Sequence, residues 1–189
     1  SALIVGAGSG ISAALTRRCR DAGMSVALAA RDGARARAVA DETGATLHQC
    51  DAGSISDVAA LFAALDDGPG TPDLVVYNPS ARVRGPIAAL DPEETRRALE
   101  VTCFGAFLVA QQAARRMLAR GSGSIFFTGA SAGVKGFANS SVFAMRKFGL
   151  RGLAQSLARE LHPQNIHIGH FVIDGGIRSD RPDRRDDGD

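Results

Sequence analysis

Short apolar runs alternate along the chain with longer segments in which apolar residues recur at every third or fourth position. A short run closed by a glycine or a polar residue is typical of a strand buried on both faces, and the longer pattern is typical of an amphipathic helix. The short runs predict strands at Ala2–Val5, Val26–Ala30, Thr46–Cys50, Asp73–Tyr77, Ser124–Thr128 and Ile166–Ile173.

Helical segments fill the intervals between these strands. The stretch Asp91-Pro92-Glu93-Glu94 is a well-formed helix start, because Asp caps a helix and Pro fits its first turn. Strands that alternate with helices in this way are parallel and joined by crossover helices, which predicts an α/β fold. We expect a Rossmann-like doubly wound parallel β-sheet with helices on both faces, in a single domain. The pattern predicts helices from Ile11 to about Ala22, over Ala34–Thr43 and Ser56–Leu65, from Asp91 to about Arg120, and over Ser140–Leu161.

Composition narrows the function classes. Of 189 residues, 45% are hydrophobic and 22% are charged, which is ordinary for a globular domain, and the net charge of +2 gives no support for nucleic-acid binding. No signal peptide or membrane-length apolar run is present, so we expect a cytoplasmic protein with a small-molecule substrate and neither a nucleic-acid nor a membrane partner. Cys19, Cys50 and Cys103 lack the spacing of a metal site, and we expect buried thiols and no metal.

The first strand ends in a glycine-rich turn that opens the first helix, at residues 6–12. Gly6 permits a sharp turn, Gly10 lets the backbone approach a phosphate, and the helix start favours an anion. This device holds a nucleotide pyrophosphate, so Gly6, Ser9, Gly10 and Ile11 are candidate cofactor-binding residues. Glycines also form plain tight turns at strand ends, and these residues alone leave both interpretations open.

Residues that directly follow the strands of an open parallel sheet line one cleft at its carboxyl edge. Arg31 follows the second strand, where a guanidinium suits the 2′-phosphate of NADP and a carboxylate would suit the ribose of NAD. Because Asp32 comes next, we favour NADP and keep NAD as the alternative. Arg31 is alternatively an ordinary surface salt-bridge residue at a helix start.

The third strand is followed by Asp51, which is placed either to accept a hydrogen bond from an adenine amino group or to cap the next helix. Ala52, Asn78 and Ile177 are further candidate cofactor-binding residues. We expect the dinucleotide-binding domain to span residues 1–177. Residues 178–189 have no apolar periodicity and are expected to form a charged tail or mobile loop.

The order of these pieces resembles the short-chain dehydrogenase/reductase family over nearly the whole chain. The family pattern Gly-x-x-x-Gly-x-Gly is similar to residues 6–12, with Ser12 in place of the last glycine. Its Asn-Asn-Ala-Gly is similar to residues 77–80, its Val-Asn-x-x-Gly to residues 101–105, and its Tyr-x-x-x-Lys to residues 143–147. The resemblance implies a nicotinamide cofactor, hydride transfer, and a homodimer or homotetramer built on the two long helices.

The same resemblance shows where the chain departs from the family. There a tyrosine hydroxyl moves the proton, a lysine lowers the pKa of that tyrosine and binds the nicotinamide ribose, and a serine steadies the substrate oxygen. Here Phe143 replaces the tyrosine, Thr102 replaces a supporting asparagine, and Ala130 falls at the serine position. The candidate catalytic residues are therefore Lys147, which persists, and Ser131, which would point the wrong way in extended backbone unless a turn redirects it.

No other side chain replaces the missing acid in an obvious way. Tyr77 is the only tyrosine and falls at the end of the fourth strand, and among the four histidines His170 is the least remote candidate. We favour an NAD(P)-dependent oxidoreductase that acts between a carbonyl and an alcohol, or on a related substrate, with an atypical active site. The alternatives are a catalytically silent nucleotide-binding scaffold or sensor, and a relative with a damaged pocket that binds no dinucleotide.

Overall fold

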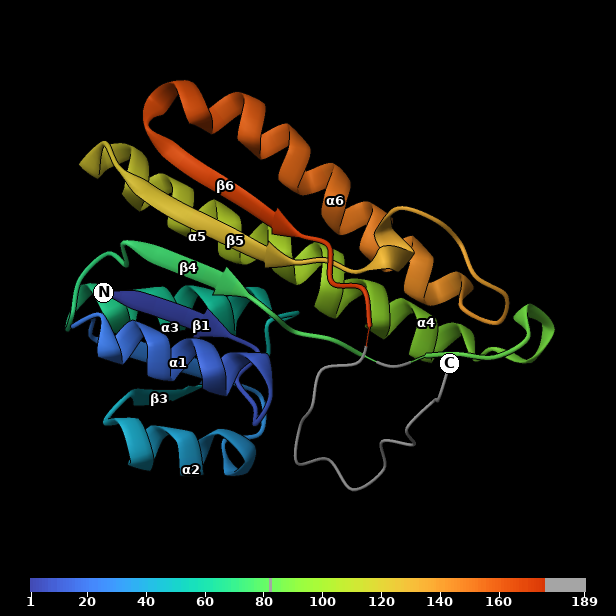
Figure 1. Cartoon of the computed structure of the whole chain (residues 1–189), viewed down its shortest axis with the longest axis horizontal. Helices are drawn as coiled ribbons and strands as arrows, with labels where there is room; N and C mark the ends of the chain where they lie inside the picture. Colours follow the sequence, from blue (N-terminus) through green and yellow to red (C-terminus); the bar gives the residue numbers. More distant parts are fainter. Residues whose placement is uncertain (82, 176–189) are drawn as a thin grey trace.

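A six-stranded parallel sheet forms the centre of the computed structural model, which describes residues 1–81 and 83–175 (Figure 1). The expected tail at 178–189 and the candidate Ile177 lie outside the described residues. The strand order is β3-β2-β1-β4-β5-β6, so the order reverses between β1 and β4 and the predicted doubly wound sheet is confirmed. The strands are β1 (Ala2–Val5), β2 (Val26–Ala30), β3 (Thr46–Gln49), β4 (Leu74–Tyr77), β5 (Gly123–Thr128) and β6 (Ile166–Phe171).

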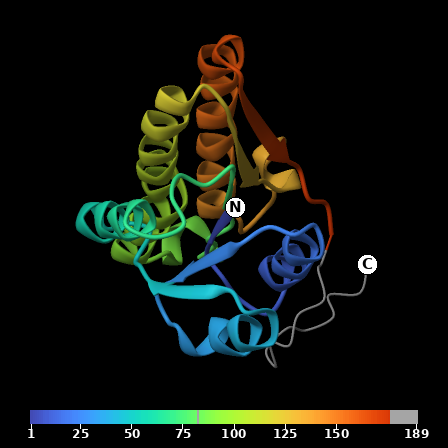
Figure 2. The same ribbon diagram turned by 90° about the vertical axis from the view of Figure 1, so that its left-hand side faces the viewer.

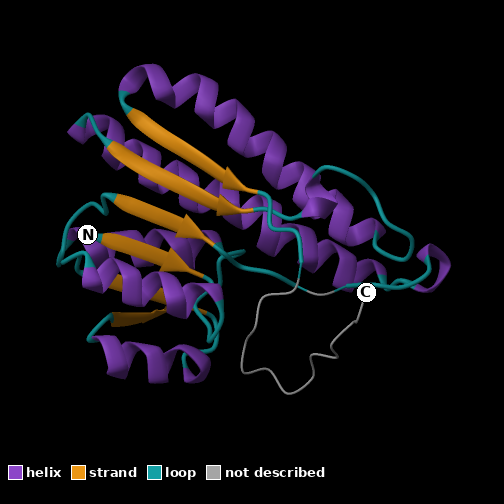
Figure 3. Ribbon diagram, viewed as in Figure 1, coloured by secondary structure: helices purple, strands orange, loops and turns teal. Residues whose placement is uncertain are grey.

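Helices cover the sheet from both sides (Figures 2 and 3). One face packs against α1 (Ile11–Asp21) and α2 (Ala34–Thr43). The other packs against α3 (Ile55–Asp66), α5 (Gly105–Arg120) and α6 (Ser141–Leu161). The other helical elements of the described chain are α4 (Pro92–Leu99), a π-helical segment (Glu100–Phe104) and the 3-10 turns Ile87–Ala89, Ser131–Gly133 and His162–Gln164.

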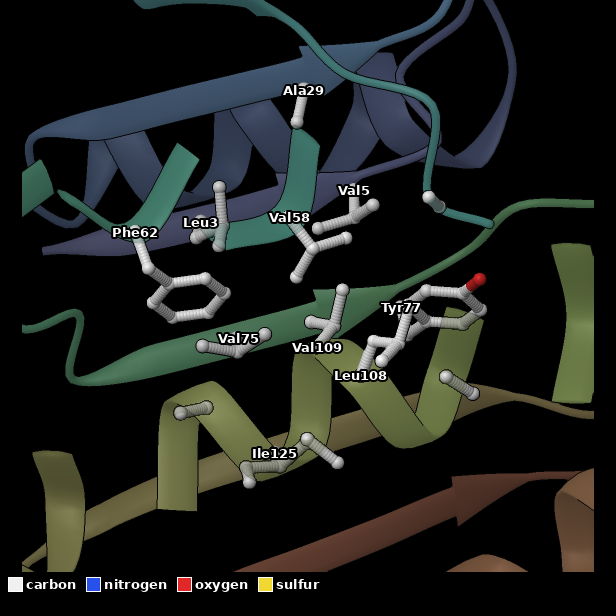
Figure 4. Close-up of a cluster of buried hydrophobic side chains, with 14 of the residues drawn as sticks. Leu3, Val5, Ala29, Val58, Phe62, Val75, Tyr77, Leu108, Val109 and Ile125 are labelled. Atoms are coloured by element: carbon white, nitrogen blue, oxygen red, sulfur yellow. The ribbon is translucent and has the colours of Figure 1, made fainter. Parts of the chain in front are cut away.

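The larger core lies between the sheet and the layer of α3, α5 and α6 (Figure 4). Phe62, Val75, Val109 and Ile125 are all fully buried there. Full burial of a side chain of this kind contributes about 1.5–3 kcal/mol relative to leaving it exposed. Because helices cover both faces, the central strands are apolar on both sides, and this is why the sequence shows continuous apolar runs instead of alternation.

The helix expected from Asp91 to about Arg120 begins as predicted but is interrupted. Asp91 caps it by accepting hydrogen bonds from the backbone N–H groups of Glu93 and Glu94, at 2.6 and 3.0 Å. A π-helical segment at Glu100–Phe104 then separates α4 from α5. The prediction of one continuous α-helix is therefore wrong at this segment.

The interruption comes from the packing of Tyr77 against the helix. Within the π segment the N–H of Gly105 donates to the carbonyl of Glu100, which releases the carbonyl of Val101. That carbonyl accepts the hydroxyl of Tyr77. A Cβ on Gly105 would lie 2.5 Å from the Tyr77 hydroxyl and 2.4 Å from the carbonyl oxygen of Ala52, so glycine is required at this contact.

Two strands end earlier than predicted. β3 stops at Gln49, and β6 stops at Phe171 instead of Ile173. The N–H of Gly129 still donates to the carbonyl of Phe171 at 2.7 Å, but the next donor, the N–H of Ser131, already belongs to a 3-10 turn. Regular pairing therefore ends where the chain turns away from the sheet into this 3-10 turn.

Candidate functional site

The glycine turn lies where the strand order reverses. Gly6 has a φ of +82°, and a Cβ there would lie 2.5 Å from the backbone nitrogen of Pro79, so the position requires glycine for two reasons. A Cβ on Gly8 would meet no atom within 4 Å. The turn therefore packs tightly against the loop after β4 on one side and is open on the other.

The start of α1 lies just behind this turn. No side chain caps the helix and no acidic residue stands in its first turn. The first N–H groups of a helix have no acceptor within it, and they favour an anion together with the helix dipole. Ser9 is exposed, and Gly10 and Ile11 are half-buried. An uncapped helix start behind an open turn fits the phosphate groups of a dinucleotide.

A chain of hydrogen bonds joins this turn to the far end of the site. The Ser12 hydroxyl donates to the carbonyl of Gly6 at 3.0 Å and accepts from Asn78 Nδ2 at 2.8 Å. Asn78 Oδ1 accepts from the Thr128 hydroxyl at 2.8 Å, and the carbonyl of Thr128 accepts from Lys147 Nζ at 2.6 Å. Asn78 is therefore in the site, but its side chain is already bonded to protein groups on both sides.

Arg31 lies at the carboxyl end of β2, where its side chain is exposed. Within the described part of the chain it forms no hydrogen bond or ion pair. The neighbouring carboxylate of Asp32 accepts the N–H of Ala34 at 3.0 Å and so helps to start α2. The guanidinium of Arg31 is thus available to a ligand at this strand end.

Asp51 lies at the end of β3, and both of its carboxylate oxygens already have protein partners. Its Oδ1 accepts from the N–H of Gly53 at 3.0 Å, and its Oδ2 pairs with Nη2 of Arg97 at 3.3 Å. It does not cap the next helix, because Ser54 is the N-cap residue of α3. Ala52 is buried, with its carbonyl facing Gly105.

Tyr77 is not a substitute for a missing catalytic hydroxyl. Its side chain is 1% exposed and points into the core (Figure 4), where its hydroxyl donates to the carbonyl of Val101. Burial raises the pKa of the Tyr77 hydroxyl well above its usual value. The structure therefore agrees with the expectation that the only tyrosine plays no part in proton transfer.

Lys147 projects from α6 toward the end of β5 and is 4% exposed. Burial, and next the positive charge of Arg146, lower the pKa of Lys147 to about 8. An ammonium has three donors, and among the described residues only the carbonyl of Thr128 accepts one of them. Lys147 is thus a buried cation that can lose its proton close to neutral pH.

Two arginines flank Phe143, and the sequence analysis missed both. The guanidinium carbons of Arg84 and Arg146 lie 5.5 and 5.1 Å from the centroid of the Phe143 ring. Arg146 is 1% exposed, donates from Nη1 to the Thr102 hydroxyl at 3.2 Å, and leaves its Nε without a partner. Burial lowers the pKa of Arg146 to about 10. The sequence contained one indication of the contact between Phe143 and Arg146, because residues three apart lie on the same side of a helix.

Ser131 lies in a turn and not in extended backbone, as its candidate catalytic role requires. Ala130 is extended, and Ser131 begins the 3-10 turn that follows. A Cβ on Gly133 would lie 2.9 Å from the carbonyl oxygen of Lys147, so the turn packs directly on α6. The Ser131 hydroxyl makes no hydrogen bond to the rest of the described chain. Ser131 and Lys147 are thus brought to the same end of the sheet.

His170 lies against the backbone of Gly129, where a Cβ would be 2.4 Å from its Nε2. This nitrogen is buried without a partner. Burial, followed by the charges of Lys147 and Arg151, lowers the pKa of His170. The imidazole is therefore neutral at pH 7, which suits a proton donor poorly.

The thiols differ in burial. Cys19 and Cys50 are buried as expected, but Cys103 is half-buried and its Sγ donates to the carbonyl of Arg146 at 3.2 Å. Across residues 1–81 and 83–175, no group of three or more His, Cys, Asp or Glu side chains is placed to hold a metal. None of the helices in those ranges combines the length and the apolar character that a membrane crossing requires.

Comparison with known proteins agrees with this geometry. The family described as short chain dehydrogenase matches residues 1–186. The 3-oxoacyl-[acyl-carrier-protein] reductase MabA of Mycobacterium tuberculosis is 28% identical over 180 residues, which cover 95% of this chain and 70% of that protein. Carbonyl reductase family member 4 of Xenopus tropicalis is 29% identical over 94% of this chain and 75% of its own. The structure of a short-chain dehydrogenase from Rhodopseudomonas palustris is 34% identical, with a TM-score of 0.83 over 96% of this chain and 85% of that one.

Proposed function

This chain belongs to the short-chain dehydrogenase family, and from that premise we propose that it is an oxidoreductase that prefers NADP and transfers hydride between the nicotinamide and a carbonyl or alcohol carbon. The family implies NAD(P) as the cofactor. The observation that carries the proposal is the position of Lys147, a buried and titratable cation at the end of β5 that is hydrogen-bonded into the same network as the glycine turn.

The residues of the site divide between the two ends of the cofactor. The turn from Gly6 through Ser9 and Gly10 to Ile11 would hold the phosphates. Arg31 would pair with the 2′-phosphate, and this supports NADP over NAD because a guanidinium directly follows β2 where a carboxylate would suit a ribose diol. Asp51, Ala52 and Asn78 would line the adenosine side, Ile177 would add a contact beyond β6, and Lys147 would hold the nicotinamide ribose.

The chemistry needs a proton source in place of the tyrosine. When bound, the nicotinamide supplies or accepts the hydride at the substrate carbon. In the reducing direction Lys147 Nζ would give a proton to the substrate oxygen as negative charge develops there, and solvent would later return it. Ser131, with its unpartnered hydroxyl, would steady that oxygen. A lysine with a pKa of about 8 suits this exchange at neutral pH.

Two measurements test the proposal in order. Fluorescence titration with NADPH and NADH should show binding of both, with NADPH the tighter ligand. A panel of ketones assayed with NADPH should then reveal turnover that the Lys147→Met variant loses. Absence of dinucleotide binding at millimolar concentration would refute the whole proposal, whereas binding without turnover would refute only its catalytic part.

One observation favours a second function, a nucleotide-binding scaffold or sensor without hydride chemistry. Phe143 has no hydroxyl, and Ala130 has none at the position that the family gives to serine. The Phe143→Tyr variant separates the two functions. Activity that exists only in that variant would favour the silent protein, and appreciable wild-type activity would exclude it.

We further expect the protein to be cytoplasmic and to form a homodimer or homotetramer. Large apolar side chains are exposed on and beside the two long helices, and Phe104 and Phe107 stack there with ring centroids 6.2 Å apart. Met145 and Phe148 are similarly exposed on α6. Light scattering after size-exclusion chromatography should give a mass of two or four chains, and a monomer would contradict this expectation.

A further inference from the structure

The end of the site beside α6 carries buried positive charge without a counter-ion. Arg146 and Lys147 are adjacent in sequence and are 1% and 4% exposed. In the described part of the chain no Asp or Glu forms an ion pair with either of them, or with Arg84. Among the described residues, the titratable group that would oppose their charge is the thiol of Cys103, and burial raises the pKa of that thiol, so it stays uncharged at neutral pH.

Such an arrangement is unusual because a buried charge normally has a partner of opposite sign. The Nε of Arg146 is buried and has no hydrogen-bond acceptor among the described residues, while Nη1 donates to the Thr102 hydroxyl and the guanidinium lies over the Phe143 ring. A guanidinium presents donors in a planar fork that matches a carboxylate. An anion bound here would satisfy the donors and neutralise the charge at the same time.

The cofactor does not supply this anion. The negative charges of NADP lie on its phosphates, and the residues that fit them are at the glycine turn and Arg31. The nicotinamide ring is neutral when reduced and positive when oxidised. At the end of the site where Lys147 would meet it, the cofactor therefore leaves the excess positive charge in place or increases it.

From these observations we infer that the substrate carries a carboxylate, as an oxo acid or hydroxy acid does, and that Arg146 binds this group with help from Arg84. The inference rests on the proposed function for the identity of the reacting carbon, but the anion site itself does not depend on hydride transfer. The ring of Phe143, which is half-buried, lies against the guanidinium groups of both Arg84 and Arg146. In the proposed complex, the side chain that stands in place of the family's tyrosine would therefore line the anion site.

The site can be tested on the full chain without cofactor. Urea unfolding is followed in sodium levulinate, a small oxo acid, in sodium formate, the smallest carboxylate, and in sodium chloride at equal ionic strength. Both carboxylates should stabilise the wild-type protein more than chloride does, and methyl levulinate, which lacks the charge, should not. No difference between the carboxylates and chloride, or an equal effect of the ester, would overturn the inference.

Variants identify the residue responsible. Arg146→Met should weaken levulinate binding by roughly tenfold or more, because it removes a charge-assisted pairing. Arg159→Met, which removes an exposed arginine from the same helix, is the matched control and should bind as the wild type does. If Arg146→Met does not fold, Arg146→Lys keeps the charge but loses the fork, and its binding should still be several-fold weaker. Unchanged binding in the folded Arg146 variant would overturn the assignment, and NADPH titration of the same samples reports independently on the proposed function.

Discussion

The guanidinium of Arg146 donates from Nη1 to the hydroxyl of Thr102 at 3.2 Å, although one residue belongs to α6 and the other to the π-helical segment before α5. Thr102 stands where the family pattern has an asparagine, and Arg146 directly precedes the retained Lys147. The two residues are therefore coupled, since the threonine hydroxyl is the acceptor that a buried guanidinium needs. A substitution at either residue should therefore remove a hydrogen-bond partner of the other.

Thr102→Val tests this coupling. The substitution keeps the shape of the side chain but leaves Nη1 of a buried cation without its acceptor, so it should lower the free energy of unfolding by about 1–3 kcal/mol. Urea denaturation measures the change. Thr46→Val, at an exposed position of β3, should change stability by only about 0.5 kcal/mol or less. Equal effects of the two substitutions would show that the hydrogen bond contributes nothing.

Gly6→Ala should destabilise the protein by about 3 kcal/mol or more, because alanine is strained at a φ of +82° and its Cβ would overlap Pro79. Gly8→Ala is the matched control within the same turn, and it should cost about 1 kcal/mol or less since a Cβ there meets open space. Thermal unfolding monitored by circular dichroism compares the two variants. A Gly6→Ala protein as stable as Gly8→Ala would contradict the tight contact after β4.

Tyr77 can be titrated without interference, because the chain contains no other tyrosine. Its pKa is raised by burial, so the folded phenol should remain protonated above pH 10, the value of an ordinary tyrosine. The folded state then binds more protons than the unfolded state, and stability should fall as the pH rises above about 10. Ultraviolet absorbance follows the formation of the phenolate. Ionisation near pH 10 in protein that is still folded would show that the hydroxyl is accessible to water.

Titration of Lys147 should make the rate of ketone reduction decline at alkaline pH. A proton donor must be protonated to act, so kcat/KM for ketone reduction should fall as the pH rises through about 8, and the oxidising reaction should show the opposite trend. Lys147→Arg keeps a positive charge that is not lost in this range, and it should remove this decline and lower the rate by roughly 10²–10⁴-fold. If the decline persists in the variant, another group donates the proton.

Arg31→Ala should weaken NADPH binding by roughly tenfold or more and leave NADH binding unchanged, because only NADPH carries the phosphate that a guanidinium would hold. Arg35→Ala removes an exposed arginine from the first turn of α2 and is the control. Fluorescence titration gives both affinities. A parallel loss for the two cofactors would place Arg31 outside the 2′-phosphate site.

The fold was accessible to sequence reasoning because buried parallel strands and their crossover helices each leave a strong period in the chain. That alternation predicted a doubly wound parallel sheet, and the structure supplies the order of its strands. The interruption at Glu100–Phe104 left no such trace, since it depends on Tyr77, which comes from β4 and is distant in sequence. Local sequence patterns predict each helix and strand well. They do not predict a hydrogen bond between two elements, such as the one from the Tyr77 hydroxyl to the helix.

For the candidate site, the structure gives the positions of the predicted residues, while their roles stay predictions. Residues that follow strands lie at the carboxyl edge of the sheet, and Lys147 lies at the same end. Arg146 was missed because a charged residue on a helix is ordinarily solvated, and nothing in its neighbours indicates 1% exposure. Whether a charged side chain is buried depends on how the whole chain packs, so it cannot be read from the local sequence. A buried charge needs a partner of opposite sign, and this is why Arg146 indicates a ligand.

The hydrogen bonds that run from Gly6 through Ser12, Asn78 and Thr128 to Lys147 place one amide side chain between the glycine turn and the buried ammonium. Under the proposed function, a substitution at Asn78 should therefore alter cofactor affinity and the reactivity of Lys147 together, and neither property could be changed alone at this position.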